Sequence, residues 1–485
     1  MMSSMAVTAL AIQPSALKIM SRHKSWLVLP LLFSFDLSVL VGSFGISILT
    51  WSLSHEQIHI AFYIQEWPVL AVFLAAYWAA DLYRVVGVSP VEELRCSVLA
   101  TTGGIFFLVC LTFLTKENEE YSTGVMILAG LLATILIPVV RLTVRPFIGE
   151  RAWFAKPVAI LGAGRTAALV IETLRKNPGL ALRPVVAFDD NPARQGSLKG
   201  VPVIAGLNSA SSFCRSAGID YAIITMPDAS RETFLTVIRK AASVFSNLLL
   251  VPDLFGVSSL WVRARDLGGV LGLEVQDELQ KPGALLLKRL LDLTLILLSL
   301  PIFLPTCVLL SLLVKLSSKG SVFYAQKRIG KDGNVIRVWK FRTMVNNADA
   351  VLKKHLEENP HFESEWRKDQ KLKCDPRVTG VGRFLRRTSL DELPQVWNVV
   401  RGDMSLVGPR PVVEAEIDKF GNTWDLYTRV LPGITGLWQV SGRNNLTYIE
   451  RVKLNEYYVR NWSSWLDLYV LFKTIRVVFT SDGAY

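Results

Sequence analysis

The chain has 485 residues, of which 51% are hydrophobic and 19% are charged, and its mean hydropathy is +0.35. This length is too great for one ordinary domain, and this hydropathy is too high for a fully soluble protein. The net charge of +12 could suit nucleic acid, but in so apolar a chain basic segments that face anionic lipid headgroups and an anionic substrate explain it better. We therefore expect a multi-domain membrane protein that binds no nucleic acid.

The cysteines argue against two kinds of stabilising site. They are odd in number, widely scattered and without a CxxC pair, at Cys96, Cys110, Cys214, Cys307 and Cys374. A disulfide framework or a zinc site would need closer, paired spacing. The pattern fits a reducing cytosolic environment.

Four apolar segments follow a cytosolic lead-in over residues 1–25, and each is close to the roughly 20 residues that cross a bilayer. They are Trp26–Thr50, Ile60–Ala80, Ser97–Thr115 and Ser122–Val140. Basic residues precede the first segment, separate the second from the third and follow the fourth, at Arg22, Lys24, Arg84, Arg95, Arg141, Arg145, Arg151 and Lys156. Because cytoplasmic loops carry the excess of Lys and Arg, we expect a four-helix transmembrane bundle over residues 26–145 with both ends in the cytoplasm.

Residues 156–260 have the pattern of a Rossmann-like α/β domain. A strand and turn, PVAILGAG, precede a helix, RTAALVIETLRKN, and a second strand, PVVAFDDN. Gly162 and Gly164 supply the first two glycines of a dinucleotide fingerprint, Ala167 stands in the third place, and Asp189 ends the next strand, where a ribose contact is expected. A domain that binds no dinucleotide and serves as a spacer or dimer surface explains the same residues, so both interpretations stay open.

A membrane-bound NAD-dependent nucleotide-sugar dehydratase or epimerase is the main alternative function that this domain suggests. Such enzymes use a Tyr-x-x-x-Lys pair shortly after the cofactor-binding strands, with the tyrosine as acid and base. The chain has this spacing only at Tyr469 and Lys473, near its C-terminus and far from the glycines. The alternative therefore has little support.

A long apolar stretch, predicted as a membrane helix over residues 284–318, precedes the last region. Basic residues flank it on both sides, at Lys288, Arg289, Lys315, Lys319, Lys327 and Arg328, so both ends are expected in the cytoplasm. Pro301 and Pro305 near the middle remove backbone donors, and Ser299 can help satisfy the freed groups. We expect a re-entrant helix, broken at Ser299 to Pro301, that enters one leaflet and returns.

The segment Gly382–Pro411, GRFLRRTSLDELPQVWNVVRGDMSLVGPRP, places two adjacent carboxylates among arginines. Ser389 and Glu392 have capping-box spacing, which predicts a helix start with Asp391 in its first turn. Free backbone N–H groups there favour an ionised carboxylate and attract phosphate. Asp391 could then be a nucleophile and Glu392 a Mg²⁺ ligand. Capping alone would explain the carboxylates, but not the neighbouring Arg383, Arg386, Arg387 and Arg410.

The motifs of the C-terminal region occur in the order that one family has. They are KRLLD, the SLP break, KFRTM, DPRVT, TSLDELPQ, SLVGPRP, PGITGLWQVSGRN and DGAY. The chain therefore resembles the bacterial sugar transferases of the monotopic phosphoglycosyl transferase family, and more narrowly the long, WbaP-type undecaprenyl-phosphate galactose phosphotransferases. The resemblance implies an α+β catalytic domain over residues 319–485, on the cytoplasmic face of the bacterial inner membrane.

The resemblance also implies a reaction. In the family the aspartate of the DE dyad, here Asp391, attacks the β-phosphorus of a UDP-sugar, releases UMP and holds a phospho-sugar that passes to undecaprenyl phosphate. A hexose-1-phosphate, galactose before glucose, would thus be transferred to begin exopolysaccharide, capsule or O-antigen synthesis. Glu392 would bind Mg²⁺. Arg410 would bind phosphate, and the further candidate contacts to phosphate or nucleotide are Lys340, Arg342, Arg377 and Arg443.

Further expectations concern the re-entrant helix, the partners and the alternative functions. Asp292 would pair with Lys288 or Arg289 to fix the re-entrant helix. The partners would be a UDP-hexose, undecaprenyl phosphate, the lipid bilayer and a second copy of the chain. A non-enzymatic membrane scaffold is a third class of function, but it leaves the setting of the dyad unexplained. The identity of the hexose, the polysaccharide and any nucleotide on the Rossmann-like domain stay open.

Overall fold

The computed structural model describes residues 25–53, 67–83, 86–115, 123–252, 262–275, 279–359, 363 and 375–480, apart from 207–209, 228, 243, 267, 269–270, 280 and 444–445. Nearly all of the predicted lead-in, the beginning of the second apolar segment and the DGAY motif thus lie outside the described residues. The chain forms two compact units, Met1–Leu254 and Phe255–Tyr485.

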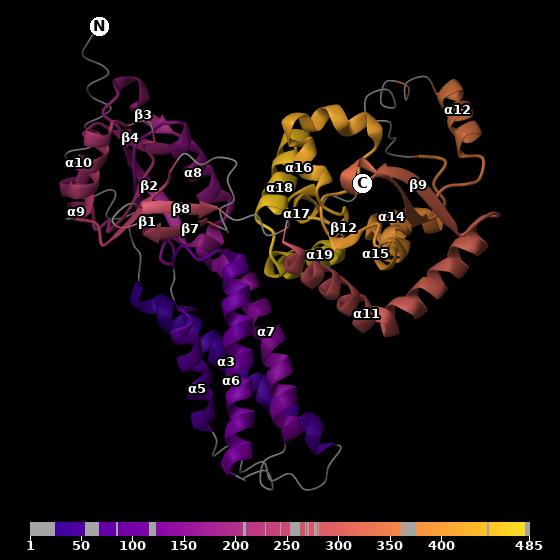
Figure 1. Cartoon of the computed structure of the whole chain (residues 1–485), viewed down its shortest axis with the longest axis horizontal. Helices are drawn as coiled ribbons and strands as arrows, with labels where there is room; N and C mark the ends of the chain where they lie inside the picture. Colours follow the sequence, from indigo (N-terminus) through magenta and orange to yellow (C-terminus); the bar gives the residue numbers. More distant parts are fainter. Residues whose placement is uncertain are drawn as a thin grey trace. The chain divides into compact units, whose positions relative to one another are not determined.

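Four apolar helices at the beginning of the first unit correspond to the four predicted segments (Figure 1). They are α3 (Ser25–Ser52), α5 (Trp67–Ala79), α6 (Pro90–Thr115) and α7 (Thr123–Gly149). Among the described residues, the helices long and apolar enough to cross a membrane are α3, α6, α7 and, in the second unit, α11 (Pro282–Ser317), whereas α5 is shorter. Helix α6 begins before the predicted Ser97, and α7 continues past the predicted Val140.

The additional turns of α6 and α7 carry charged side chains that are buried against α3. Arg141 donates to both carboxylate oxygens of Asp36, at 2.9 and 2.5 Å. Glu93 contacts Arg141 at 3.2 Å and Arg145 at 2.8 Å, and the four side chains are at most 3% exposed. Arg145 also donates to the backbone carbonyl of Gly179, which lies beyond the end of α7. Two acids neutralise two arginines, so these polar turns can be buried.

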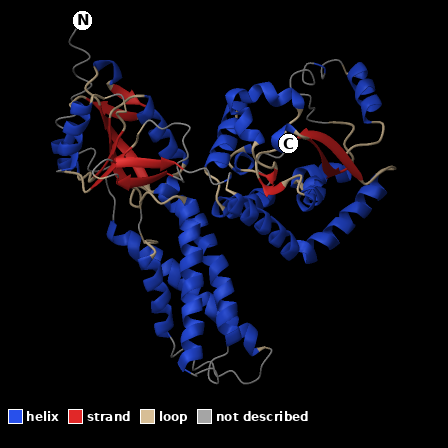
Figure 2. Ribbon diagram, in the orientation of Figure 1, coloured by secondary structure: helices blue, strands red, loops and turns tan. Residues whose placement is uncertain are grey.

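A six-stranded sheet in the order β3-β4-β2-β1-β5-β6 forms the centre of the α/β domain (Figure 2). Its elements are β1 (Lys156–Leu161), α8 (Arg165–Lys176), η2 (Pro178–Leu180), β2 (Leu182–Phe188), η3 (Pro192–Arg194), β3 (Gly196–Leu198), β4 (Val201–Ile204), α9 (Ala210–Ala217), β5 (Tyr221–Ile224), α10 (Arg231–Ala242) and β6 (Asn247–Leu250). All strand pairs are parallel except β3 with β4. Helix α8 packs on one face through Ile171, and α9 and α10 pack on the other through Cys214 and Ala241. The predicted parallel α/β domain is confirmed.

The second unit combines many helices with short two-stranded sheets, as an α+β domain does. Its elements are β7 (Val262–Asp266), β8 (Leu271–Val275), α11, β9 (Phe323–Ile329), η5 (Lys331–Gly333), β10 (Val335–Phe341), α12 (Ala348–Glu358), α14 (Gly380–Thr388), η6 (Leu390–Gln395), α15 (Val396–Arg401), β11 (Ser405–Val407), η7 (Glu414–Thr423), α16 (Trp424–Thr428), β12 (Gly433–Thr435), α17 (Leu437–Val440), α18 (Tyr448–Arg460) and α19 (Ser464–Thr480).

Helix α11 bends midway, and both arms lean towards the rest of the second unit in Figure 1. The predicted break at Ser299 is wrong in its strict form, because the residues stay helical through Pro301 and Pro305. Prolines inside a helix are a common cause of such a bend. Buried residues at four-residue spacing place one face of each arm on the unit, at Lys288, Asp292 and Ile296 and then at Leu310 and Val314. Exposed apolar residues cover the outer face, including Leu286, Leu290, Leu297, Leu298, Ile302, Leu309, Leu312 and Leu316.

The predicted ion pair of Asp292 with Lys288 or Arg289 is wrong. Lys288 pairs with Asp467 of α19 at 2.7 Å. Asp292 accepts hydrogen bonds from the hydroxyl of Ser405 at 2.6 Å and from the next backbone N–H at 3.3 Å. The expected partners all lie on α11 itself, whereas the fold brings groups from β11 and α19 against it. These charges therefore fix α11 to β11 and α19 rather than to itself.

Candidate active site

The antiparallel hairpin of β9 and β10 directs two cations to one face. In its register Arg328 lies opposite Ile336, which precedes Val338 and Lys340 at two-residue steps. Side chains alternate along a strand, and directly opposed residues share a face. Arg328, Val338 and Lys340 therefore point to the same side of the hairpin.

The two adjacent carboxylates lie in the tight turn η6, between helices α14 and α15. Ser389 adopts a left-handed conformation with φ of 58°, ends α14 and makes no side-chain capping bond. The amide of Glu392 donates to the carbonyl oxygen of Ser389, not to its hydroxyl. The predicted capping box is therefore wrong. Pro394, which has no N–H to donate, limits η6 to a 3₁₀ turn before α15 begins.

Lys340 connects the hairpin to this turn. Its ammonium lies 2.5 Å from a carboxylate oxygen of Glu392 and 3.9 Å from one of Asp391. Burial raises the pKa of Asp391 to about 6, with Glu392 adding to the rise and with Lys340 and Arg386 opposing it. Burial also raises the pKa of Glu392, but attraction to Lys340 and Arg410 outweighs it and holds that pKa below its ordinary value. The two neighbouring acids thus differ in proton affinity.

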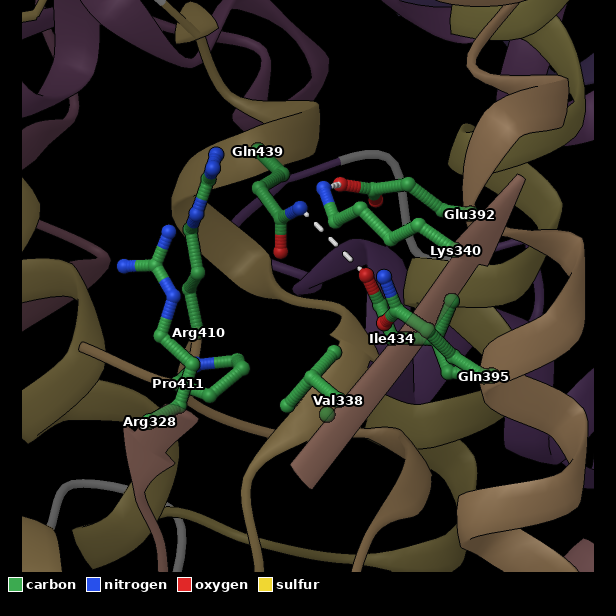
Figure 3. Close-up of a pocket in the computed structure, with 10 residues that line it drawn as sticks. Arg328, Val338, Lys340, Glu392, Gln395, Arg410, Pro411, Ile434 and Gln439 are labelled. Atoms are coloured by element: carbon green, nitrogen blue, oxygen red, sulfur yellow. Dashed lines mark hydrogen bonds and ion pairs between the residues drawn. The ribbon is translucent and has the colours of Figure 1, made fainter. Parts of the chain in front are cut away.

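A solvent-open cavity lies beside the turn (Figure 3). Its lining residues are Arg328, Val338, Lys340, Glu392, Gln395, Arg410, Pro411, Gly433, Ile434 and Gln439. Figure 3 places Arg328 and Arg410 on one side of the cavity and Lys340 and Glu392 on the other. An open cavity with Glu392 and Lys340 on one side and two guanidinium groups on the other suits an anionic substrate.

Comparison with known proteins identifies the family of this region. The family model described as bacterial sugar transferase matches residues 283–481, and a model described as CoA-binding domain matches residues 79–252. The UDP-galactose-lipid carrier transferase of Erwinia amylovora is 36% identical over 92% of this chain and 93% of its own length. The chain belongs to the bacterial sugar transferase family.

Two further relatives of this bacterial sugar transferase differ in length. The UDP-glucose:undecaprenyl-phosphate glucose-1-phosphate transferase of Escherichia coli is 31% identical over 86% of this chain and 88% of its own length. The exopolysaccharide production protein ExoY of Sinorhizobium fredii is 48% identical over 41% of this chain and 88% of its own length. As a member of this family, the chain is an enzyme.

The structure places three of the basic residues predicted for the sugar transferase site away from the cavity lining. Arg342 donates to the backbone and hydroxyl oxygens of Ser318, at 2.8 and 2.9 Å. Arg377 pairs with Asp375 at 2.6 Å. Arg443, with φ of 47°, lies in the turn after α17. Lys340, Glu392 and Arg410 do line the cavity, whereas Asp391 is not part of the lining and lies 3.9 Å from the ammonium of Lys340.

The dyad has the donors that Mg²⁺ prefers, since carboxylate oxygens are hard ligands. The ammonium of Lys340 against Glu392 marks a position where positive charge is favourable. Among the described residues, however, no group of three or more His, Cys, Asp or Glu side chains could hold a metal. The residues therefore fit a Mg²⁺ ion that takes its other ligands from substrate phosphates and water.

The glycine turn of the α/β domain lies in the first unit, apart from these residues in the sequence. Gly162 has φ of 99°, and a Cβ there would lie 2.9 Å from a backbone oxygen. One carboxylate oxygen of Asp189 accepts from the amide of Ala163 at 2.8 Å, and the other accepts from that of Asn191 at 2.9 Å. Asp189 thus holds the turn near Gly164, and the ribose contact predicted for it stays a prediction.

Arg328, Gln395 and Gln439 line the cavity but were not among the residues predicted for the site. Hairpin register could have indicated Arg328, because it places Arg328 on the face of Lys340. No comparable signal marked Gln395 or Gln439. Gln395 lies in η6 and Gln439 in α17, and these elements are far apart in the sequence.

Proposed function

We propose that the chain transfers a hexose-1-phosphate from a UDP-hexose to undecaprenyl phosphate, by two displacements through an aspartyl phospho-sugar. The observation that carries the proposal is the Asp391–Glu392 pair, held against Lys340 beside a cavity with two further cations. The relatives are named as transferases that use a UDP-sugar and a lipid carrier.

Asp391 supplies the nucleophile. At neutral pH a carboxyl group with a pKa of about 6 is mostly ionised, and burial leaves its oxygens poorly solvated. Its oxygen attacks the β-phosphorus of the UDP-hexose, the bond from this phosphorus to the bridging oxygen breaks, and UMP leaves with the electron pair. An oxygen of undecaprenyl phosphate then attacks the same phosphorus, and the Asp391 carboxylate is restored.

The surrounding charges favour both displacements. Lys340 neutralises part of the negative charge of the dyad, so an anionic diphosphate can approach Asp391. Arg410 holds a phosphate oxygen through a planar donor group. Mg²⁺ bound at Glu392 would neutralise charge on the diphosphate as that charge moves to UMP.

We propose that α11 is re-entrant, so that the catalytic unit stays on the cytoplasmic face of the inner membrane. Two contact regions on α11 support this. Ile296 packs with Val338 and Met404, and Leu310 and Val314 pack in a second cluster of the same unit. A straight spanning helix would carry one of these regions across the bilayer, away from the polar unit that contacts it. The exposed leucines of the outer face would then contact lipid.

The galactose donor is supported by the Erwinia relative, whereas the Escherichia relative is named for glucose. The Sinorhizobium relative is named for exopolysaccharide production, which supports a role at the start of polysaccharide synthesis. We therefore propose galactose-1-phosphate as the transferred group.

UMP release from a panel of UDP-hexoses tests the proposed reaction. Purified protein in lipid nanodiscs is given each UDP-hexose with Mg²⁺ and undecaprenyl phosphate, and each component is omitted in turn. We expect multiple-turnover release only when both are present, with UDP-galactose preferred. Without the lipid, release should stop near one UMP per active site. No release from any UDP-hexose would refute the proposed function.

A further inference from the structure

Arg328 lines the cavity and forms no ion pair with any carboxylate that the structure describes. Its Nη2 donates to the side-chain oxygen of Gln326 at 3.0 Å, and no carboxylate of the described residues lies within ion-pair distance. Burial lowers the pKa of Arg328 and the neighbouring charge of Arg410 lowers it further, while the charges of Glu416 and Glu392 oppose this without reversing it. A half-buried guanidinium that faces another cation is costly unless an anion binds there.

Arg410 is equally open to a ligand. Its guanidinium lies 5.9 Å from the ring centre of Trp438, and it donates no hydrogen bond to any described side chain or backbone group. The dyad is already neutralised in part by Lys340, which lies across the cavity (Figure 3). The donors of both guanidinium groups therefore remain for a substrate.

A phosphate monoester dianion matches this arrangement. Two planar guanidinium groups can each donate two parallel hydrogen bonds to phosphate oxygens. Two positive charges also balance its two negative charges. A sugar hydroxyl or a neutral base would leave both charges uncompensated.

We propose that Arg328 and Arg410 form one phosphate-monoester subsite, which holds the phosphate of UMP in the first displacement and that of undecaprenyl phosphate in the second. The inference rests on the proposed function and adds a residue and a shared position to it. In the first step the bond between Asp391 and phosphorus forms as UMP leaves. In the second step a lipid phosphate oxygen bonds to the same phosphorus, and the bond to Asp391 breaks.

In-line geometry explains the sharing. In each displacement the bond that forms and the bond that breaks lie on opposite sides of phosphorus. Asp391 occupies one side in both steps, so the leaving UMP and the entering lipid phosphate occupy the other side in turn. Neither step requires a proton from Arg328 or Arg410, which act only by binding.

Arg328→Gln in the full-length protein in nanodiscs tests the subsite, with Lys327→Gln as its control. Lys327 is the exposed neighbour on the same strand, and its side chain alternates to the other face. UMP binding is measured by calorimetry, and the KM for undecaprenyl phosphate is measured by transfer. We expect Arg328→Gln to weaken UMP binding and to raise that KM, each about tenfold or more. The control should change each by less than about twofold.

Inhibition separates the two sources of phosphate. UMP should compete with undecaprenyl phosphate, and Arg328→Gln should weaken the binding of UMP and of undecaprenyl phosphate to a similar extent. Weaker UMP binding with an unchanged KM for the lipid would overturn the shared subsite. If neither UMP binding nor the KM for undecaprenyl phosphate changes, Arg328 does not belong to the subsite.

Arg328→Lys covers the case in which the glutamine variant does not fold. It keeps the charge and loses the planar fork, so both affinities should fall by a smaller factor at an unchanged midpoint of thermal unfolding. Wild-type affinities in this variant would overturn the proposal. UMP binding needs no turnover, so it can be measured even if the protein releases no UMP from any UDP-hexose. In that case the proposed function would be refuted. UMP binding that depends on Arg328 and is competed by undecaprenyl phosphate would still support the subsite.

Discussion

Lys340 makes two neighbouring carboxylates unequal. It lies 1.4 Å closer to Glu392 than to Asp391, by the difference between 3.9 and 2.5 Å. Glu392 is thereby kept ionised, as its proposed role as a Mg²⁺ ligand requires, while Asp391 keeps a pKa of about 6. The DE motif in the sequence indicated the pair, but the assignment of unequal pKa values requires the position of Lys340.

Removal of Lys340 is predicted to move the acid limb of activity to higher pH. Asp391 attacks as a carboxylate, so kcat/KM for the UDP-hexose should fall as the pH drops below about 6. Lys340 lowers the pKa of Asp391, so Lys340→Met should raise it and should also reduce kcat/KM at neutral pH by about a hundredfold. The measurement is kcat/KM across pH at saturating Mg²⁺. Lys340→Arg keeps the charge and should leave the acid limb of the pH profile near its wild-type position. An acid limb at the wild-type pH in Lys340→Met would mean that Lys340 does not set the pKa of Asp391.

Arg328 shows what residue patterns leave out. It belongs to a run of basic residues outside the quoted motifs, so the sequence does not distinguish it from its exposed neighbour Lys327. Only the pairing of β9 with β10 places it beside Val338 and Lys340 in the cavity. Side chains brought together by strand register therefore cannot be recognised from sequence motifs, even where the strands themselves are expected.

Helix α11 is the element on which the membrane contact of the second unit depends. Apolar length indicated a membrane helix and the two prolines indicated a break within it, but neither indicated the partners of the helix. Lys288 is fixed by Asp467, whose other oxygen accepts from the hydroxyl of Tyr458 at 2.6 Å. The sequence separation of these groups explains why an ion pair within the helix was expected instead.

The buried pair is predicted to stabilise the second unit far more than a surface pair does. Asp467→Asn leaves the ammonium of Lys288 buried without its counter-charge and should cost about 3 kcal/mol or more of unfolding free energy. The matched control breaks the ion pair of Arg460 and Glu456 on α18, which is 37% and 23% exposed. Glu456→Gln should cost less than about 1 kcal/mol. Denaturant unfolding in detergent micelles measures both, and equal losses would argue against the anchoring role.

Accessibility of the two ends of α11 tests its topology. In a cysteine-free background, Lys281→Cys precedes the helix and Lys319→Cys follows it. A re-entrant helix returns to its starting side, so a membrane-impermeant maleimide should label both positions in inside-out vesicles and neither in right-side-out vesicles. Labelling of the two positions from opposite sides would mean that α11 crosses the bilayer.

At the scale of the whole molecule, the apolar segments, the parallel α/β domain and the order of the sugar transferase motifs were all indicated by the sequence. The lengths of α6 and α7 were not. Hydropathy ends a membrane helix at its charged residues, whereas the fold pairs Glu93 with Arg141 and Arg145 and continues both helices. Pairing between distant charges cannot be read from local hydropathy.

The second unit is predicted to carry the transfer reaction without the first. Every residue that lines the cavity follows Phe255, and the Sinorhizobium relative matches only 41% of the chain over 88% of its own length. A chain that begins at Lys281 should therefore release UMP with the same UDP-hexose preference as the full chain. The assay is run on the purified, folded fragment in nanodiscs. A folded but inactive fragment would assign the first unit a part in catalysis.

The mass of the intact protein reveals whether a covalent intermediate forms on Asp391. Wild-type protein is incubated with Mg²⁺ and its preferred UDP-hexose without undecaprenyl phosphate, beside Asp391→Asn, which keeps the shape of the side chain and loses the nucleophile. We expect the wild type to gain one hexose phosphate on Asp391 for each UMP released and to lose it when the lipid is added. Asp391→Asn should fold normally and gain nothing. Full turnover by Asp391→Asn, or turnover by the wild type with no adduct at Asp391, would contradict a covalent intermediate on Asp391.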